Sequence, residues 1–473
     1  MQTKFKCFVL IFLSGFLFNC FEDVDDIIVS DGNVKDFIWK AMNAVYLYKS
    51  EVNDLSNDRF ANATEYQDFL NNYEMQEELF EALVYDRQTV DRFSILTSNY
   101  FQLEQQLSGL TRSNGAEFNF YSVPGNTTAI FGVVRLVLPN SSASSSGLYR
   151  GQVFNKINGV SISNANLSSL LSTNSYSLNI ATYNDNNTET FDDDQITDSS
   201  EVITLTKQDY SENPIYNYTT IDLNPEKVGY LMYNGFVSEY DSALNQVFAE
   251  FQSQNIDELI LDLRYNSGGS IRSATLLGSM ITGQFNNQVF TTLRYNENLE
   301  SNNTDFNFTN TINNQLSINS LNLDKLYVLT SNRSASASEM MINSLKSYIN
   351  VVQIGDSTVG KSQASQFIYD SPNLGRNNAN PNHTYAILPL IAITVNKDNE
   401  QIPPSGITPT TTLVERPGNY GTIGSPDEPL LEAALADIQG SNRQATAWES
   451  QSPILESYFI NSLETLMYVE AAD

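Results

Sequence analysis

Hydrophobic residues recur at helical spacing early in the chain and at strand spacing further on. Between residues 33 and 107, two sets of apolar positions each fall on one face of a helix, with the polar loop SNDRFANAT between them. The first set is Phe37, Ile38, Ala41, Val45 and Tyr48, and the second is Leu79, Phe80, Leu83 and Val84. This pattern predicts a small helical N-terminal domain, in which no group of catalytic residues is evident.

A different pattern predicts an α/β domain over residues 215–440. The apolar runs Val228–Met232 and Leu259–Leu263 have the length of buried strands, and the segment between them carries one apolar helical face. A strand, a helix and a strand in this order predict a parallel pair with a right-handed crossover. A further helical face closes the domain, and residues 441–473 are a tail to which no structure is assigned.

The region between these two domains is rich in short β-type runs. Residues 108–184 alternate such runs with turn residues, the clearest run being Ala129–Leu138. The stretch NDNNTETFDDDQITDSSE (residues 184–201) is polar and acidic, has few apolar positions and covers the first part of residues 185–214. We therefore predict a β-rich domain followed by an exposed linker.

A strand-turn-helix junction is predicted near residue 336. The apolar run Leu326–Leu329 gives way to Ser334, Ser336 and Ser338, and then to a helical face. A serine there lies beside free helix N–H groups and the positive end of the helix dipole, which stabilise a developing oxyanion. The junction therefore offers a serine nucleophile, with all three serines as candidates.

A serine nucleophile needs a base, and the chain contains one histidine, His383, in the turn-like sequence NPNHT. A Ser-His-Asp triad is therefore disfavoured. Lysine is the remaining candidate, and it must be neutral to accept a proton, so burial must lower its pKa. Lys361 is the best placed, because it follows Gly360 in a turn that closes a second apolar run, Val351–Ile354.

The motif SASASE, followed by a helix, a strand and a G…GK turn, resembles the active site of the C-terminal processing (tail-specific) serine peptidases. In that family the middle serine is the nucleophile and the lysine of the GK turn is the base. The resemblance therefore implies Ser336 as nucleophile and Lys361 as base, with Glu339 helping to hold the lysine. It also implies an α/β core of the ClpP/crotonase type with a mixed or parallel sheet, and neither a metal nor a cofactor.

The segment DLRYNSGG, residues 262–269, resembles the second signature of the family, D-L-R-x-N-x-G-G. Glycines at a strand end let backbone N–H groups face a ligand. Gly268 or Gly269 is therefore expected to complete an oxyanion hole with the N–H of Ala337, while Asp262 and Arg264 brace the turn. The later segment IPPSGITPT resembles the closing G-I-x-P-D turn of the family, with threonine in place of aspartate.

Part of the β-rich region resembles a PDZ domain, at Gly147-Leu148, Gly151 and Ile157-Asn158-Gly159. Gln152 stands where that family has aspartate. The resemblance implies a groove that adds a peptide as an extra strand and can capture a C-terminal carboxylate. A degenerate PDZ-like domain that only packs on the core is the alternative.

The start of the chain has the layout of a secretory signal. Residues 1–19 carry Lys4 and Lys6 ahead of an apolar run that is too short for a membrane span, and Cys20 follows directly. We predict lipidation at Cys20, an acidic tether over residues 20–32, and anchoring in the bacterial cell envelope, on the periplasmic or surface face of the outer membrane. An ordinary signal with an incidental cysteine is the alternative.

These features together predict an exported serine endopeptidase that acts on polypeptides and presents their C-termini at the PDZ-like domain. A formal charge of −30 at pH 7 disfavours nucleic acid as a partner. The alternative function is a non-catalytic, peptide-binding surface lipoprotein, in which Ser336 and Glu339 form only a capping box.

A minor alternative is a P-loop nucleotide binder, because Gly355–Ser362 (GDSTVGKS) matches G-x-x-x-x-G-K-[ST]. A P-loop requires a helix directly after this sequence, where the helix N-terminus receives phosphate. The residues that follow, QASQFIYDSP, are predicted to be extended.

Overall fold

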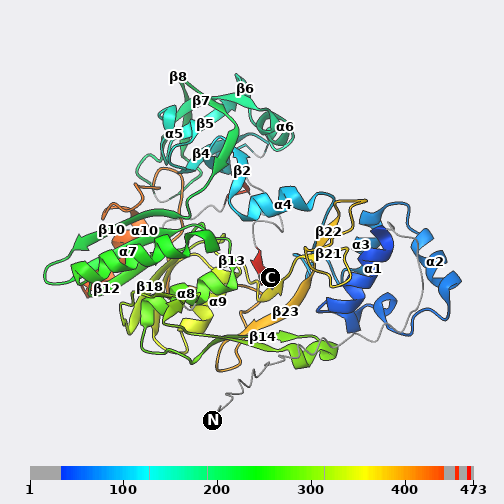
Figure 1. Cartoon of the computed structure of the whole chain (residues 1–473). Coiled ribbons are helices and arrows are strands. Elements are labelled where there is room, and N and C mark those ends of the chain that lie inside the picture. The colour runs from blue at the N-terminus through cyan, green and yellow to red at the C-terminus, as the bar shows by residue number, and fades with distance from the viewer. Residues whose placement is uncertain are drawn as a thin grey trace, which may run out of the picture.

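The computed structural model describes residues 34–126, 128–188, 190–313, 315–440, 453–456 and 466–469. These residues form three units: a group of N-terminal helices, a β-rich unit and an α/β core (Figure 1). The N-terminal helices and the β-rich unit lie against two sides of the core, and the end of the described chain lies near the place where the three meet (Figure 1).

The core is built on a six-stranded sheet in the order β10-β11-β12-β18-β19-β24. Its strands are β10 (Ile215–Asp222), β11 (Lys227–Tyr233), β12 (Glu258–Asp262), β18 (Lys325–Thr330), β19 (Asn350–Gly355) and β24 (Thr411–Thr412). Strands β11 to β24 along this order are parallel, and helix α7 (Asp241–Gln254) joins β11 to β12. The predicted strand-helix-strand unit is therefore confirmed.

Helices cover both faces of this sheet: α8 (Ile271–Thr282), α9 (Ala337–Leu345) and α10 (Pro429–Ile438) join α7. Successive residues of a strand point to opposite faces. Leu261 and Val328 accordingly pack with residues of α7, α8 and α9, whereas Ile260 and Leu329 pack with residues of α10. Because both faces are buried, the strands are continuously apolar, which is why the sequence revealed them.

A second six-stranded sheet has the order β13-β26-β20-β23-β14-β15. Its strands are β13 (Gly269–Ser270), β14 (Val289–Tyr295), β15 (Thr304–Asn307), β20 (Gln363–Ser365), β23 (Leu390–Val395) and β26 (Met467–Tyr468). Strand β26 comes from the end of the chain and pairs in parallel with both β13 and β20. The predicted tail thus places one strand inside the core.

The N-terminal helices are α1 (Val34–Val45), α2 (Ala63–Asn71), α3 (Gln76–Leu83) and α4 (Tyr100–Leu107). The prediction of a helical region is confirmed, and the apolar faces of α1 and α3 are buried in one cluster with Ile387 and Leu390 of the core. Strand β1 (Ile95–Thr97) also pairs with β22 (Ala386–Leu388), which in turn pairs with β21 (Ile368–Tyr369). This unit is therefore continuous with the core.

The β-rich unit contains β3 (Ala116–Ser122), β4 (Ile130–Val137), β5 (Val153–Ile157), β6 (Val160–Ser161), β7 (Ser175–Asn184) and β8 (Gln195–Thr206), with short helices α5 (Ser142–Ser145) and α6 (Leu167–Ser172). Two more strands, β2 (Leu110–Ser113) and β9 (Gln208–Ser211), pair with each other. Strand β25 (Leu455–Glu456) extends the main sheet by pairing with β3. Two short strands of the core, β16 (Thr311–Ile312) and β17 (Leu316–Ser317), form a separate hairpin.

The prediction of an exposed linker at residues 185–214 is wrong. Strand β8 occupies residues 195–206 of this range, pairs with β7 and ends the sheet, and β9 occupies residues 208–211. Residues 195–201 of β8 are mostly exposed on both faces, whereas Ile203 and Leu205 are buried and alternate with exposed residues. An edge strand in water needs no alternation of apolar and polar residues, so its composition resembled that of a loop.

Two predictions about the start of the chain lie outside the described residues, namely the signal at residues 1–19 and lipidation of Cys20 with its acidic tether. Among the residues that the structure does describe, no helix has both the length and the apolar character needed to span a membrane.

A buried network of charges joins the β-rich unit to the core. Arg264 pairs with Asp262 at 2.8 Å, with Glu428 at 2.5 Å and with Glu415 at 2.9 Å, and Arg150 of the β-rich unit also pairs with Glu415. Burial raises the pKa of Glu415, and the charges of Arg150 and Arg264 lower it. The arginines have the larger effect, so the pKa falls to about 2. Asp262 and Arg264 therefore brace the turn after β12, as expected.

Removing the cation at the centre of this network should destabilise the fold. Arg264→Met leaves buried carboxylates unpaired, and we expect the free energy of unfolding to fall by about 3–5 kcal/mol in urea titrations. The matched control is Arg112→Met, whose ion pair with Asp209 is largely exposed and is worth less than about 1 kcal/mol. Equal losses in the two variants would contradict a structural role for the network.

Candidate active site

Ser336 differs from its two neighbouring serines in how its hydroxyl is used. Ser334 Oγ donates to the carbonyl of Leu263 at 2.8 Å, and Ser338 Oγ donates to the carbonyl of Asn266 at 2.9 Å. Ser336 Oγ is buried and has no hydrogen-bond partner within the described residues. Of these three hydroxyls, that of Ser336 is therefore the one left without a hydrogen bond within the described residues, and the other two have a structural role.

The backbone at Ser336 is held in an unusual conformation at the N-cap of α9. Its φ of 64° and ψ of −115° lie outside the regions that residues with a Cβ prefer, and such strain persists only where surrounding contacts enforce it. Here the Glu339 carboxylate accepts from the backbone N–H of Ser336 at 2.8 Å. That contact is one half of a capping box. In a purely structural box the serine hydroxyl would also accept a backbone hydrogen bond, whereas Ser336 Oγ has no hydrogen-bond partner within the described residues.

The Glu339 carboxylate joins the serine turn to the lysine turn. One oxygen, Oε2, accepts from the backbone N–H groups of Ser336 and Lys361, the latter at 2.9 Å. The other, Oε1, accepts from the N–H of Gly360 at 2.7 Å and from Thr358 Oγ1 at 2.5 Å. Burial raises the pKa of Glu339, and these four donors oppose the rise. The backbone N–H groups of Ser336 and Lys361 therefore converge on one carboxylate oxygen.

The turn that contains Pro404 and Ile407 packs against the segment that carries Thr358 and Gly360. The N–H of Ile407 donates to Thr358 Oγ1 at 2.7 Å, and this fixes the hydroxyl that reaches Glu339. Gly360 has a φ of 88°, and a Cβ there would lie 2.1 Å from the carbonyl oxygen of Pro404. Only glycine fits this close contact between two backbones, so the GK turn is specified by packing.

Lys361 is fully buried, and burial lowers its pKa from 10.5 to about 7. Asp91 and Glu339 oppose this fall by their charge, whereas Arg92 adds to it. The ammonium nitrogen lies 4.6 Å from the centre of the Phe93 ring. The N-terminal unit thus supplies both an aromatic wall and a countercharge to the lysine. No motif around Asp91 and Phe93 marks them in the amino-acid sequence as neighbours of the lysine.

Asp91 is held firmly beside the lysine. Tyr46 Oη donates to its Oδ2 at 2.6 Å, and Ser94 donates to the same carboxylate through both its hydroxyl, at 2.6 Å, and its backbone N–H, at 2.8 Å. Ser94 Oγ in turn accepts from the N–H of Leu390 in the core at 3.0 Å. The N-terminal unit is therefore fixed to the core by hydrogen bonds next to the lysine.

The glycine turn faces Ser336 from the end of β12. Gly268 and Gly269 have φ values of 125° and 129°, and the N–H of Gly268 donates to Asn266 Oδ1 at 2.9 Å. The N–H of Gly269 instead donates to the carbonyl of Leu466 in the segment leading to β26, at 2.6 Å. Of the two glycines, Gly269 is therefore the one whose N–H points at another peptide group. Ala337 is the first residue of α9, where a backbone N–H has no acceptor within the helix.

Two alternatives from the sequence do not fit the structure. The P-loop hypothesis for Gly355–Ser362 is wrong, because strand β20 and not a helix follows the GKS sequence. His383 is engaged elsewhere: its Nδ1 accepts from the N–H of Tyr385 at 3.1 Å and its Nε2 donates to Asp370 at 2.9 Å.

The described residues contain no cluster of three or more His, Cys, Asp or Glu side chains suited to a metal ion.

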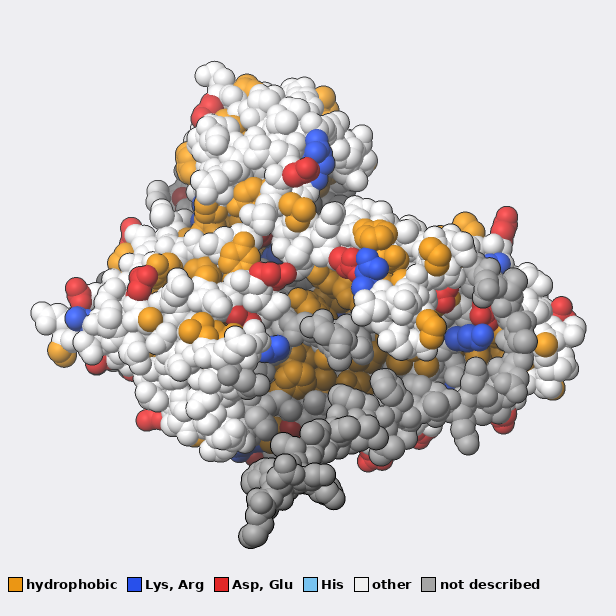
Figure 2. Space-filling view, viewed as in Figure 1, with side chains coloured by type: hydrophobic (Ala, Val, Ile, Leu, Met, Phe, Trp, Pro, Cys, Tyr) orange, Lys and Arg blue, Asp and Glu red, His pale blue; other side chains and the backbone are white. Residues whose placement is uncertain are grey.

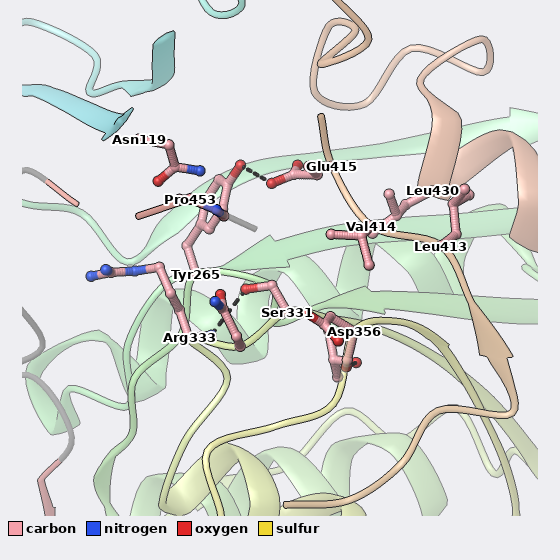
Figure 3. Close-up of a pocket in the computed structure, with 12 residues that line it drawn as sticks. Asn119, Tyr265, Ser331, Arg333, Asp356, Leu413, Val414, Glu415, Leu430 and Pro453 are labelled. Atoms are coloured by element: carbon pink, nitrogen blue, oxygen red, sulfur yellow. Dashed lines mark hydrogen bonds between the residues drawn. The ribbon is translucent and has the colours of Figure 1, made fainter. Parts of the chain in front are cut away.

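A separate pocket lies between the β-rich unit and the core, where Tyr265 and Glu415 point toward one another (Figure 3). The Tyr265 hydroxyl donates to Glu415 at 2.7 Å, and Pro453, just before β25, forms part of the wall. Ser336, Glu339 and Lys361 do not line it. This pocket therefore belongs to the contact between the two units and not to the serine site.

The structure thus contains a serine with an unused hydroxyl at a helix N-cap and a buried lysine of lowered pKa, whose backbones are joined through Glu339. These are the groups that a serine peptidase with a lysine base requires. Residues 227–412 match the family model described as peptidase family S41, and residues 33–95 match the peptidase S41 N-terminal domain. The chain belongs to peptidase family S41.

Individual relatives agree with this membership. The chain is 25% identical over 243 residues to a carboxyl-terminal-processing protease of Picosynechococcus sp. (strain ATCC 27264 / PCC 7002 / PR-6), covering 50% of this chain and 51% of the relative. The chain thus spans about half the length of this curated relative.

Two solved structures are also similar. A Bacteroides fragilis NCTC 9343 protein described as an S41 protease has a TM-score of 0.68 and 27% identity, over 85% of this chain and 97% of that one. A photosystem II D1 C-terminal processing protease has a TM-score of 0.49 and 17% identity, over 86% and 99% of the two chains. The first of these supports an S41-type α/β fold with mixed sheets and an N-terminal helical region.

The burial of Lys361 should cost stability in a manner that depends on pH. Between pH 7 and pH 10.5 the unfolded lysine is charged and the folded one is neutral, so the unfolded state binds more protons and stability rises with pH in this window. Lys361→Met should therefore raise the free energy of unfolding at pH 7 by on the order of 3 kcal/mol, and this gain should shrink toward pH 10.

Urea titrations at pH 7, 8.5 and 10 measure this effect. Lys346→Met is the matched control, because Lys346 is partly exposed and pairs with Glu400 at 3.1 Å. A gain in the Lys361 variant that stays constant or grows with pH would contradict a buried, neutral lysine.

Proposed function

We propose that the protein is a serine endopeptidase of the C-terminal processing type, which hydrolyses peptide bonds through a Ser336–Lys361 dyad. The observation that carries the proposal is the shared carboxylate of Glu339, which holds the backbones of both residues while Lys361 is buried with a pKa near 7. A lysine that is half neutral at physiological pH is a competent general base.

In the proposed reaction Lys361 Nζ takes the proton from Ser336 Oγ, which attacks the carbonyl carbon of a peptide bond. The N–H groups of Ala337 and Gly269 stabilise the oxyanion, and Gly268 shapes the turn that presents Gly269. Lys361 then gives its proton to the leaving amine, and a water molecule hydrolyses the acyl-enzyme in the same way. Glu339 acts as a positioning residue, because it contacts backbone groups of the dyad.

The substrates are proposed to be exported polypeptides, and the β-rich unit is proposed to be a PDZ-like domain that presents their C-termini. A sheet edge that accepts an extra strand is the property such a domain requires. The edge of β3 is of this kind, since it accepts β25 as an added strand through Leu455 and Glu456. Lipidation at Cys20 would anchor the protein in the cell envelope close to such substrates.

Dyad variants test this function directly. Ser336→Ala and Lys361→Ala should each lose at least about 1,000-fold in kcat/KM on an unfolded protein such as reduced casein, because each removes a group that acts in the chemical step. Ser253→Ala and Lys346→Ala, at exposed positions on other elements, should retain the wild-type rate. Equal product from the dyad variants and the wild type would leave the peptide-binding alternative.

The pH dependence of the reaction follows from the pKa of the base. Only neutral Lys361 accepts the serine proton, so kcat/KM should rise about tenfold per pH unit below pH 7 and level off above it. Rates measured from pH 5 to pH 9 check this, with circular dichroism confirming that the protein stays folded. A profile that falls between pH 6 and pH 8 would contradict lysine as the base.

A further inference from the structure

We propose that this protein is also its own substrate, and that Ser336 cuts its chain between Leu466 and Met467. This inference rests on the proposed peptidase function and adds to it a defined bond and a pocket that selects the residue before the cut. It concerns residues 466–469, which include β26 and are called the cleft strand below.

The cleft strand binds as a peptide substrate would, through backbone pairing on both of its sides. Met467 and Tyr468 pair in parallel with Gly269 and Ser270 of β13, and Tyr468 also pairs with Ser365 of β20. The N–H of Val469 donates to the carbonyl of Ser365 at 3.1 Å. Main-chain hydrogen bonds of this kind hold an extended peptide regardless of most of its side chains.

The carbonyl of Leu466 occupies the position of a scissile carbonyl. Its oxygen accepts from the N–H of Gly269, the proposed oxyanion donor, at 2.6 Å. That oxygen and Ser336 Oγ both border Gly268, at 2.6 Å and 3.2 Å from the point where a Cβ on this glycine would lie. The peptide bond of Leu466 is thus presented to the nucleophile, and the absence of a side chain at Gly268 leaves room for both groups.

The side chain of Leu466 fills an apolar pocket between the N-terminal unit and the core. It is 2% exposed and packs with Leu103 of α4 and Leu388 of β22, and Ile95, Leu107 and Phe367 complete the surroundings. In the space-filling view, hydrophobic side chains gather in the hollow between the three units (Figure 2). A pocket of this composition favours a leucine-like residue before the cut and excludes a charged one.

Residues 454–456, which precede the cleft strand in the sequence, pair with the β-rich unit. Leu455 and Glu456 pair with Phe120 and Asn119 of β3, and the N–H of Ile454 donates to the carbonyl of Phe120 at 2.9 Å. The segment is therefore held at two places on its own molecule. Such tethering raises the effective concentration of the bond at Ser336, so the cut is intramolecular.

The reaction is an ordinary peptide hydrolysis. Ser336 Oγ bonds to the carbonyl carbon of Leu466 while its proton passes to Lys361, and the bond to the nitrogen of Met467 breaks as that nitrogen takes the proton back. Water then attacks the ester, giving a carboxylate on Leu466 and free Ser336. The products are a chain that ends at Leu466 and the segment that begins at Met467.

Intact-mass spectrometry of the purified full chain tests the proposal, alongside digestion of reduced casein by the same preparations. Wild type should lose the mass of the segment after Leu466 while Ser336→Ala remains whole, and the half-time of the loss should not change on dilution. Leu466→Asp should leave the tail uncut and keep casein digestion, because it puts a charge into the apolar pocket without altering the dyad.

Each other result overturns the inference in a recognisable way. A wild type that digests casein but stays whole contradicts self-processing and leaves the proposed function standing. A wild type that does neither contradicts both. Equal cutting of wild type and Ser336→Ala assigns the cut to a foreign protease, and cutting of Leu466→Asp at the same bond contradicts the pocket.

Discussion

The site depends on one buried carboxylate. Glu339 lies at the first turn of α9 and is removed from water, which costs free energy unless every acceptor position is used. Four donors from two separate turns meet this requirement, and hydrogen bonds to a charged acceptor are the stronger kind. The strained backbone of Ser336 and the position of Lys361 are both consequences, because neither turn can move without leaving the carboxylate unsatisfied.

The chemistry of the lysine is set by the assembly of two units. The core supplies the turn that carries Lys361, but the ring of Phe93, from the N-terminal unit, lies against its ammonium group. Burial lowers the pKa of the lysine, and Asp91 from the same unit limits the fall. The N-terminal unit is therefore part of the surroundings of Lys361, and strand pairing and hydrogen bonds fix it to the core there.

Two separate sheets of the molecule each pair with a strand from the end of the chain through backbone hydrogen bonds. Strand β3 of the β-rich unit and strands β13 and β20 of the core each pair with a strand from the end of the chain. Sheet edges with unpaired N–H and C=O groups bind extended polypeptides of many sequences. The Arg264 network, through Glu415 and Arg150, joins the β-rich unit to the core at the end of β12.

The amino-acid sequence by itself determined the strand-helix-strand unit, the helical N-terminal region, the serine and glycine turns, and lysine as the candidate base. These features depend on local periodicity, on turn residues and on the scarcity of histidine, all of which can be read along the chain. Ser336 was singled out from Ser334 and Ser338 only through the family resemblance, because hydrogen bonds to carbonyls some seventy residues away in the chain decide which hydroxyl is free.

The tertiary structure alone decided the rest. It assigned β8 to a sheet edge, where residues 195–201 are mostly exposed on both faces and show no hydrophobic pattern, and it brought Phe93 to Lys361 and Leu466 to Gly269. Contacts between distant residues leave no periodic trace in a single sequence, since each partner looks like an ordinary residue of its own segment. The motifs therefore indicated the candidate residues, and only packing showed which groups surround them.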